Sequence, residues 1–277
     1  MKEQLANAKN HKEIGKLEMT RELAISLSAL GMIALVIFGI LFSRLYALFA
    51  GINIIEFQFS IKSMLIAAFL IISTLIFHEL IHGMFISKYG GTPHYGAGIF
   101  QRFFPYSYAT SNTTFQRNQY IVIALAPLVV ISLVGIIIMV AFTSIAYWML
   151  LPLTMNSSGA VGDLWMISIL LRFPKHVLVE DNITGLTVYG KQSDNPLNIS
   201  IENYLLNFMK GFAVAFIIVF LTSLIFLNIF SGTDGFVSTF SFEQLLASGF
   251  AGLAYSSIKS AKTKKRLRLV KLNQSNE

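Results

Sequence analysis

The chain has 277 residues, of which 55% are hydrophobic and only 13% charged, and its mean hydropathy is +0.65. This composition excludes an ordinary soluble domain and indicates an integral membrane protein. The absence of cysteine excludes disulfides and thiolate metal sites, so any metal must be bound by histidine and carboxylate side chains. The net charge of +7 arises largely from basic residues near the two termini, which fits anionic lipid headgroups and does not indicate nucleic acid as a partner.

Six apolar segments follow in chain order, each near the roughly 20 residues that a helix needs to cross the hydrocarbon core. The expected spans are about residues 22–49, 64–87, 119–142, 146–173, 208–230 and 236–258. The last segment carries Glu243 and several Ser and Gly residues, so an interfacial helix is its alternative. Six spans are favoured because they place the basic tail and most other Lys and Arg residues on the cytoplasmic side.

Two polar interruptions modify this all-α expectation. The fourth span is interrupted at 155–163, and we interpret it as one broken membrane helix whose freed backbone faces a protein or water cavity. Between 174 and 204 the chain is polar, and the alternation in LTVYGK and LNISIE indicates a short hairpin. The domain organisation is therefore a cytoplasmic basic segment (1–21), a six-span membrane domain (22–258) and a cytoplasmic basic tail (259–277).

The second span contains His78-Glu79-Leu80-Ile81-His82, which matches the HExxH motif of zinc metalloproteases. Residues four apart share a helix face, so both imidazoles can reach one ion while Glu79 projects beside it. Zinc would activate a bound water, and Glu79 would take its proton and deliver it to the leaving amine. The alternative is that these residues are buried polar contacts between helices, at a cost of about 3 kcal/mol per ionisable group.

A third ligand is expected from the broken fourth span. Asp163 is the favoured candidate because it lies at membrane depth near Gly159 and Gly162, although it could instead cap a half-helix that starts at Leu164. Asn156, in the same interruption, is a candidate for hydrogen bonding to a substrate backbone or to a group behind the ligands, or simply for satisfying the helix break. Pro127 is expected to kink the third span and open room beside the motif helix.

These residues predict a membrane-embedded zinc metalloendopeptidase that cleaves membrane-embedded or juxtamembrane peptide bonds. A metal-binding transporter, or a catalytically inactive protein that binds membrane helices, is the alternative. The expected partners are membrane-protein substrates and the lipid bilayer. The expected location is a cell membrane, crossed several times, with both termini in the cytoplasm.

The HExxH in the second span, with Asn156 and Asp163 in a later broken span, resembles the intramembrane site-2 zinc metalloproteases. The segment from about 71 to 171 more closely resembles the putative zincin peptidase family of multi-pass bacterial membrane proteins. The resemblance implies that Asp163 is the third zinc ligand. It also implies that the aromatic loop from Tyr95 to Tyr108 is a membrane-associated β-hairpin whose edge pairs with an extended substrate.

Overall fold

The computed structural model describes residues 12–52, 60–100, 104–183, 185–191 and 194, and further on 207–208, 211–212, 214–219, 222, 248 and 250–259. The chain divides into two compact units. The first contains Met1–Ala24 and Ala34–Leu197, and the second contains Ile25–Ile33 and Asn198–Glu277. The residues that carry the predicted chemistry all belong to the first unit.

Three helices among the described residues are long and apolar enough to cross a membrane: α2 (Arg21–Ala50), α3 (Ile61–Lys88) and α4 (Arg117–Ala141). Their ends lie within three residues of the first three predicted spans. Local capping sets the start of α3, where Ser60 and Ser63 exchange side-chain and backbone hydrogen bonds. The chain leaves α3 at Gly90, whose φ of 84° favours glycine.

The predicted fourth span is divided into α5 (Thr143–Gly159) and α6 (Val161–Leu170). The interruption is narrower than expected, because the 155–159 stretch remains helical and only Ala160 separates the two helices. Ala160 keeps right-handed backbone angles, and its N–H donates to the carbonyl of Asn156. The backbone therefore stays hydrogen-bonded across the break, in contrast to the freed segment that the sequence led us to expect.

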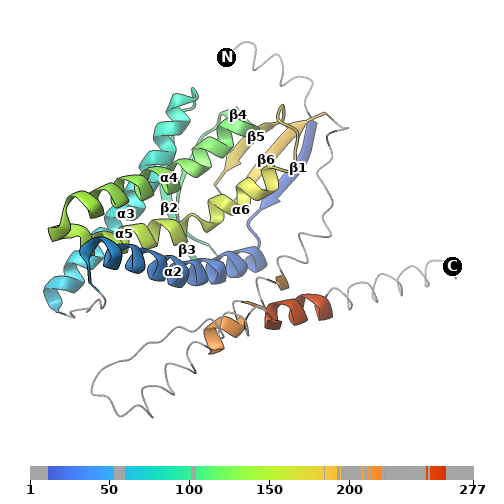
Figure 1. Cartoon of the computed structure of the whole chain (residues 1–277). Helices are drawn as coiled ribbons and strands as arrows, with labels where there is room; N and C mark the ends of the chain where they lie inside the picture. The colour runs from blue at the N-terminus through green and yellow to red at the C-terminus, as the bar shows by residue number, and fades with distance from the viewer. Residues whose placement is uncertain are drawn as a thin grey trace. The chain divides into compact units, whose positions relative to one another are not determined.

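Two antiparallel sheets accompany these helices (Figure 1). One is the hairpin of β2 (His94–Phe100) and β3 (Phe104–Thr110), formed by the aromatic loop. The other has the strand order β1-β6-β5-β4. Its strands are β1 (Lys12–Glu18), β6 (Gly185–Gly190), β5 (Leu178–Asn182) and β4 (Thr114–Gln116).

The four-stranded sheet corrects two expectations. The LTVYGK segment does form a strand, but its hairpin partner is the preceding strand β5, whereas LNISIE (197–202) lies outside the described residues. The N-terminal segment, expected to be a polar tail, supplies β1, which pairs with β6 from Lys12 to Glu18. A strand at this position was hidden because its pairing partner lies far along the chain.

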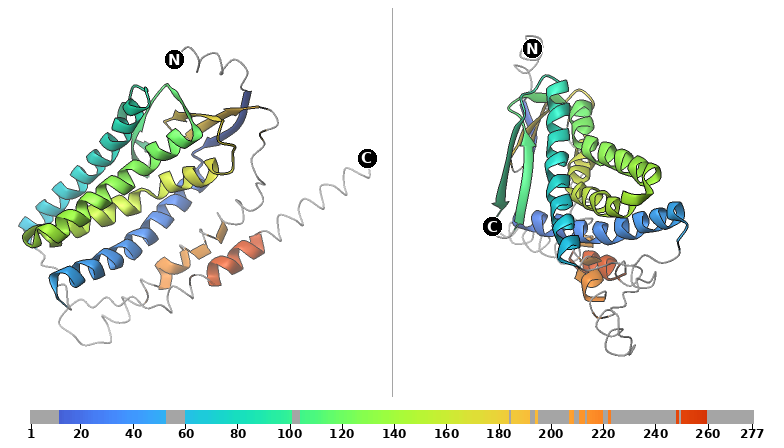
Figure 2. Two further views of the ribbon diagram at one scale, coloured as in Figure 1. Left: turned by 45° about the horizontal axis from the view of Figure 1, so that its top comes forward. Right: turned by 90° about the vertical axis from the view of Figure 1, so that its left-hand side faces the viewer.

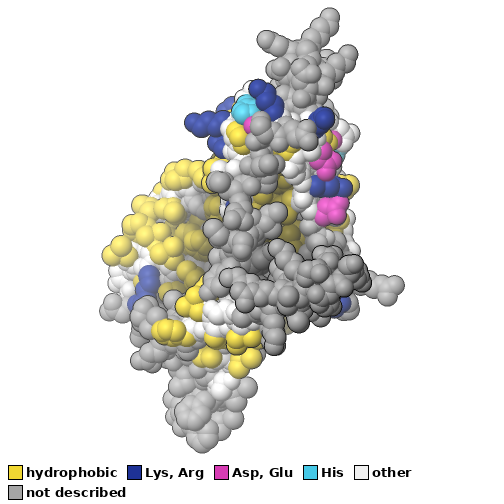
Figure 3. All heavy atoms as spheres, turned by 90° about the vertical axis from the view of Figure 1, so that its right-hand side faces the viewer, with side chains coloured by type: hydrophobic (Ala, Val, Ile, Leu, Met, Phe, Trp, Pro, Cys, Tyr) yellow, Lys and Arg dark blue, Asp and Glu magenta, His cyan; other side chains and the backbone are white. Residues whose placement is uncertain are grey.

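Helix α3 lies between the β2–β3 hairpin on one side and the helices α4 and α5 on the other (Figure 2). A core of Phe42, Met139, Ala146, Leu150 and Leu153 joins α2, α4 and α5. On the face shown in Figure 3, most of the described charged side chains gather at the top, and hydrophobic side chains cover much of the described surface below them. Exposed apolar residues on α3, which include Ile61, Met64 and Phe69, suit a lipid environment.

The second unit is described only in short helical stretches. The rings of Phe208, Phe212 and Phe216 lie one above the next at helical spacing. Gly211 and Gly252 allow two of these stretches to approach closely, since a Cβ on either would meet the other stretch. The predicted fifth and sixth spans lie mostly outside the described residues, so the total of six spans stays a prediction.

Candidate metal centre

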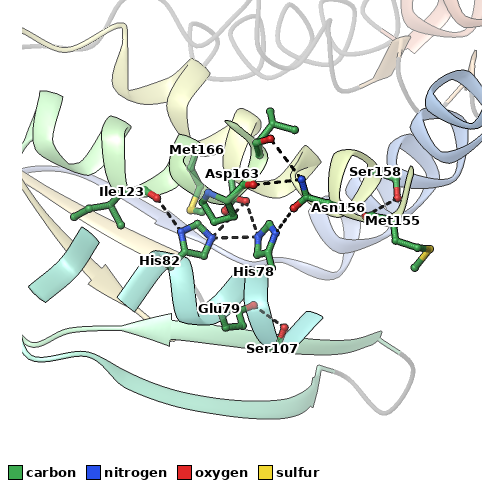
Figure 4. A network of polar contacts seen from close by, with 12 residues as sticks. His78, Glu79, His82, Ser107, Ile123, Met155, Asn156, Ser158, Asp163 and Met166 are labelled. Atoms are coloured by element: carbon green, nitrogen blue, oxygen red, sulfur yellow. Dashed lines mark hydrogen bonds and ion pairs between the residues drawn. The ribbon is translucent and has the colours of Figure 1, made fainter. Parts of the chain in front are cut away.

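His78 and His82 lie one turn apart on α3 and face the side occupied by α4, α5 and α6 (Figure 4). Asp163 approaches them from the first turn of α6. Because α6 begins at Val161 with Ala160 as its N-cap, Asp163 is not the cap that the sequence left as an alternative. The three side chains are largely buried, with 13%, 10% and 14% of their surfaces exposed for His78, His82 and Asp163.

The three side chains offer one ligand atom each to a common point. The Nε2 atoms of the two histidines are 3.2 Å apart, and the Oδ2 atom of Asp163 is 3.3 Å from His78 Nε2 and 3.7 Å from His82 Nε2. A tetrahedral zinc ion with bonds near 2.0–2.1 Å separates its ligand atoms by about 3.4 Å. The observed triangle therefore fits such an ion.

The second nitrogen of each histidine ring has a partner of its own. His82 Nδ1 is 2.9 Å from the backbone carbonyl oxygen of Ile123, and His78 Nδ1 is 3.0 Å from Asn156 Oδ1. Since a carbonyl oxygen only accepts, we assign the ring proton of His82 to Nδ1, and likewise for His78. Both Nε2 lone pairs then point at the common site, as metal-binding histidines require.

The amide of Asn156 is itself oriented by α4. Its Nδ2 atom donates to the carbonyl oxygens of Pro127 and Leu128 at 3.3 and 3.5 Å, which leaves Oδ1 to face His78. Asn156 is only 2% exposed. The structure thus places this residue behind a ligand candidate, which was one of the roles considered for it, while contact with a substrate stays a prediction.

Glu79 points to the other side of α3. Its Oε1 accepts a hydrogen bond of 2.6 Å from Ser107 Oγ on β3, and the carboxylate is turned away from the ligand triangle (Figure 4). Ser107 reaches it because alternate residues of β3 face α3, whereas Tyr106 and Tyr108 lie over Gly98 and Gly96 of β2. The sequence placed Glu79 beside the metal, whereas here it is bonded to the hairpin.

A buried carboxyl group, Asp181 on β5, lies at the sheet end of α4. Its Oδ1 accepts from the hydroxyl of Tyr120 at 3.0 Å, and its backbone carbonyl accepts from Thr110 Oγ1 at 3.2 Å. Burial raises the pKa of Asp181 from its ordinary 3.8 to about 7, although the hydrogen bond from Tyr120 partly opposes this rise. Asp181 therefore ties α4 and the hairpin to the four-stranded sheet.

Sequence reasoning missed Ser107, the Ile123 carbonyl and Asp181. A signal existed for the first two. Ser107 is a small polar residue between two tyrosines in an alternating segment, and Ile123 lies four residues before a helical proline. Asp181 had no such signal, because its hydrogen bonds join it to Tyr120 and Thr110, which lie 61 and 71 residues earlier in the chain.

Comparison with known proteins identifies a family for part of the chain. No curated protein and no solved structure matches the chain. Residues 70–178, which contain the two histidines, Glu79, Asn156 and Asp163, match the family described as putative zincin peptidase. This part of the chain therefore indicates a zinc metallopeptidase. Two of its helices, α3 and α4, are long and apolar enough to cross a membrane.

Proposed function

We propose that the protein is a membrane-embedded zinc metalloendopeptidase that cleaves membrane-embedded or juxtamembrane peptide bonds. The observation that supports this most is the convergence of His78, His82 and Asp163, with their ligand atoms within 4.8 Å of one another. Lone pairs at this separation repel one another unless a proton or a metal ion lies between them, so the geometry suits a shared cation. Two of the helices that position the group, α3 and α4, have membrane-spanning length and hydropathy.

Each side chain of the group has a distinct task in this proposal. Bound zinc would lower the pKa of a water molecule and polarise the scissile carbonyl. His78, His82 and Asp163 would hold the ion, and Asn156 and the Ile123 carbonyl orient the two rings through their Nδ1 atoms. A polar group buried between helices without such a purpose would be costly, which supports a functional role for the cluster.

Glu79 is the proposed proton acceptor. In the present orientation its carboxylate accepts a hydrogen bond from the Ser107 hydroxyl on β3. To act on a water at the ligand triangle, the side chain must turn from β3 toward α6. Catalytic hydrogen bonds often form only when the substrate is bound, so the present orientation is compatible with this role.

The β2–β3 hairpin is the proposed guide for the substrate. A membrane helix cannot be cleaved while its peptide groups are hydrogen-bonded internally, so the enzyme must hold the cleaved segment extended. Among the described residues β2 and β3 pair with each other alone, so an edge of the hairpin has backbone groups that could pair with such a segment. Its position beside Glu79 supports this proposal, since a strand paired there would run close to the base.

The test is zinc content and cleavage of membrane-helix peptides, measured on the purified full-length protein in detergent. We expect near-stoichiometric zinc in the wild type, little zinc in His82→Ala and Asp163→Ala, and full zinc without cleavage in Glu79→Gln. His176→Ala is the matched control, because His176 lies outside the group and pairs with Asp194. Zinc content that is the same in all variants, or cleavage by Glu79→Gln, would contradict the proposal.

A further inference from the structure

Pro127 lies in the interior of α4, where proline removes a backbone donor. In an α-helix the N–H of residue 127 would donate to the carbonyl of residue 123. Proline has no such N–H, and its ring pushes the carbonyl four residues earlier away from the helix axis. The Ile123 carbonyl is therefore free of its usual helical partner.

The freed carbonyl is the one that accepts from His82 Nδ1, at 2.9 Å. Both groups are buried, with Ile123 4% and His82 8% exposed. Because water has little access to either group, each depends on the other for its hydrogen bond. The Nδ1–H of His82, on the motif helix, thus takes the place of the N–H that Pro127 lacks. His82 lies 41 residues before Ile123 in the chain.

The same turn of α4 also reaches the second histidine. The carbonyl of Pro127 accepts from Asn156 Nδ2 at 3.3 Å, and the opposite side of this amide accepts from His78 Nδ1. An amide with its nitrogen committed to α4 can present only its oxygen to His78. The turn of α4 that contains Pro127 therefore helps to orient the rings of both histidines, His82 directly and His78 through Asn156.

We propose that Pro127 is a positioning residue for the metal centre. By leaving the Ile123 carbonyl without a helical donor, it fixes the Nδ1–H tautomer of His82 and directs Nε2 toward His78 and Asp163. This inference rests on the proposed function, in that zinc is taken as the ligand of the three side chains. Pro127 contacts neither zinc nor substrate in this scheme, and acts through His82 and Asn156.

Pro127→Ala tests the proposal, with Pro152→Ala as the matched control. Pro152 is also inside a helix, α5, where the carbonyl that it frees belongs to Trp148 and not to a partner of the three ligands. Alanine at 127 restores an N–H that competes with His82 for the Ile123 carbonyl. We expect the zinc dissociation constant to rise roughly 10- to 100-fold for Pro127→Ala, as for other residues that orient a ligand, and to stay unchanged for Pro152→Ala.

Two measurements on the metal-free full-length protein separate this role from a merely structural one. The thermal midpoint of Pro127→Ala should not fall, because alanine favours a helix interior more than proline does. Ring ¹⁵N chemical shifts of His82 should show one Nδ1–H tautomer in the wild type and a mixture in Pro127→Ala. A weaker affinity accompanied by a lower midpoint, or equal loss in Pro152→Ala, would overturn the proposal.

The outcomes also distinguish this inference from the proposed function. Stoichiometric zinc and cleavage in the wild type, with unchanged affinity in Pro127→Ala, would overturn the inference and leave the peptidase proposal intact. A wild type that binds no zinc, but whose His82 tautomer changes in Pro127→Ala, would overturn the peptidase proposal and support the positioning role. An unchanged tautomer with no zinc would overturn both.

Discussion

Helix α3 presents its two histidines to α4, α5 and α6 on one side and Glu79 to strand β3 on the other. On the histidine side, each ring donates a hydrogen bond from Nδ1, to the Ile123 carbonyl of α4 or to the Asn156 side-chain oxygen of α5. On the other side, the Glu79 carboxylate accepts a hydrogen bond from the Ser107 hydroxyl of β3. The ligand candidates are therefore held by helices, and the proposed base by a hairpin.

This difference assigns separate physical roles to the two sides. A metal site needs side chains whose geometry is fixed before the ion arrives, which buried helix contacts provide. A base that must meet a water and a substrate needs an orientation that can change when the substrate binds. Variants of the two sides should consequently separate metal affinity from cleavage.

Asp181→Asn should give the largest effect, which is on the pH dependence of stability, because Asp181 joins α4 to the four-stranded sheet. The folded-state pKa of Asp181, about 7, lies above its ordinary 3.8, so the folded protein binds this proton more tightly. The resulting stability is fully present below about pH 4 and is lost as the pH rises through 7, by about 4 kcal/mol in total. Thermal midpoints measured from pH 5 to 8 should therefore fall more in the wild type than in Asp181→Asn.

Glu180→Gln is the control for this experiment, because it removes a neighbouring carboxylate of the same strand whose partner is the Tyr189 hydroxyl. It should keep the pH dependence of the wild type. Identical pH profiles for the wild type and Asp181→Asn would show that the anchoring of α4 does not depend on this carboxyl group.

Asn156→Leu should give the next largest effect, because it removes the hydrogen-bond partner of His78 and leaves the contacts of Glu79 in place. Leucine cannot accept from His78 Nδ1 or donate to Pro127, so we expect zinc to bind roughly 10- to 100-fold more weakly. Competition with a chelator measures this change. Ser158→Ala should leave the affinity unchanged, since among the described residues this buried hydroxyl donates to the Met155 carbonyl within α5. An unchanged affinity in Asn156→Leu would mean that His78 needs no orienting partner.

Gly83→Ala should disturb the hairpin side of α3 instead. A methyl group at this position would overlap the ring of Tyr95 on β2, and relief of such overpacking costs about 1–3 kcal/mol. We expect cleavage to fall roughly tenfold, the equivalent of about 1.4 kcal/mol in the barrier, with zinc affinity unchanged. Tyr95→Ala in the same chain should restore cleavage by making room. Loss of zinc in Gly83→Ala would show that the two sides are not independent.

Ser107→Ala is expected to have the smallest effect. It releases Glu79 from β3, so the cleavage rate should rise about threefold. This increase is smaller than the full strength of a buried hydrogen bond to a charged group would allow, because the Ser107–Glu79 bond is only part-buried. Zinc affinity should not change, and Ser107→Thr, which keeps the hydroxyl, should resemble the wild type. A decrease in cleavage would mean that Ser107 holds Glu79 in its working orientation.

Much of the helical part was predictable because its signals are local. The apolar lengths of α2, α3 and α4 and the spacing of His78 and His82 are read within single segments. Asp163 was also predictable, because carboxylates at membrane depth are rare and costly. The division of the fourth span was foreseen, but its extent was not, since Ala160 keeps its helical hydrogen bonds.

The amino-acid sequence by itself therefore determined the membrane class, the motif helix and the identity of the three ligand candidates. Only the tertiary structure decided the ring tautomers, the direction of Glu79 and the pairing of β1 with β6. The physical reason is distance along the chain. The contacts of the His82 and His78 rings join residues 41 and 78 positions apart, and such partners follow from packing between helices, which no local pattern specifies.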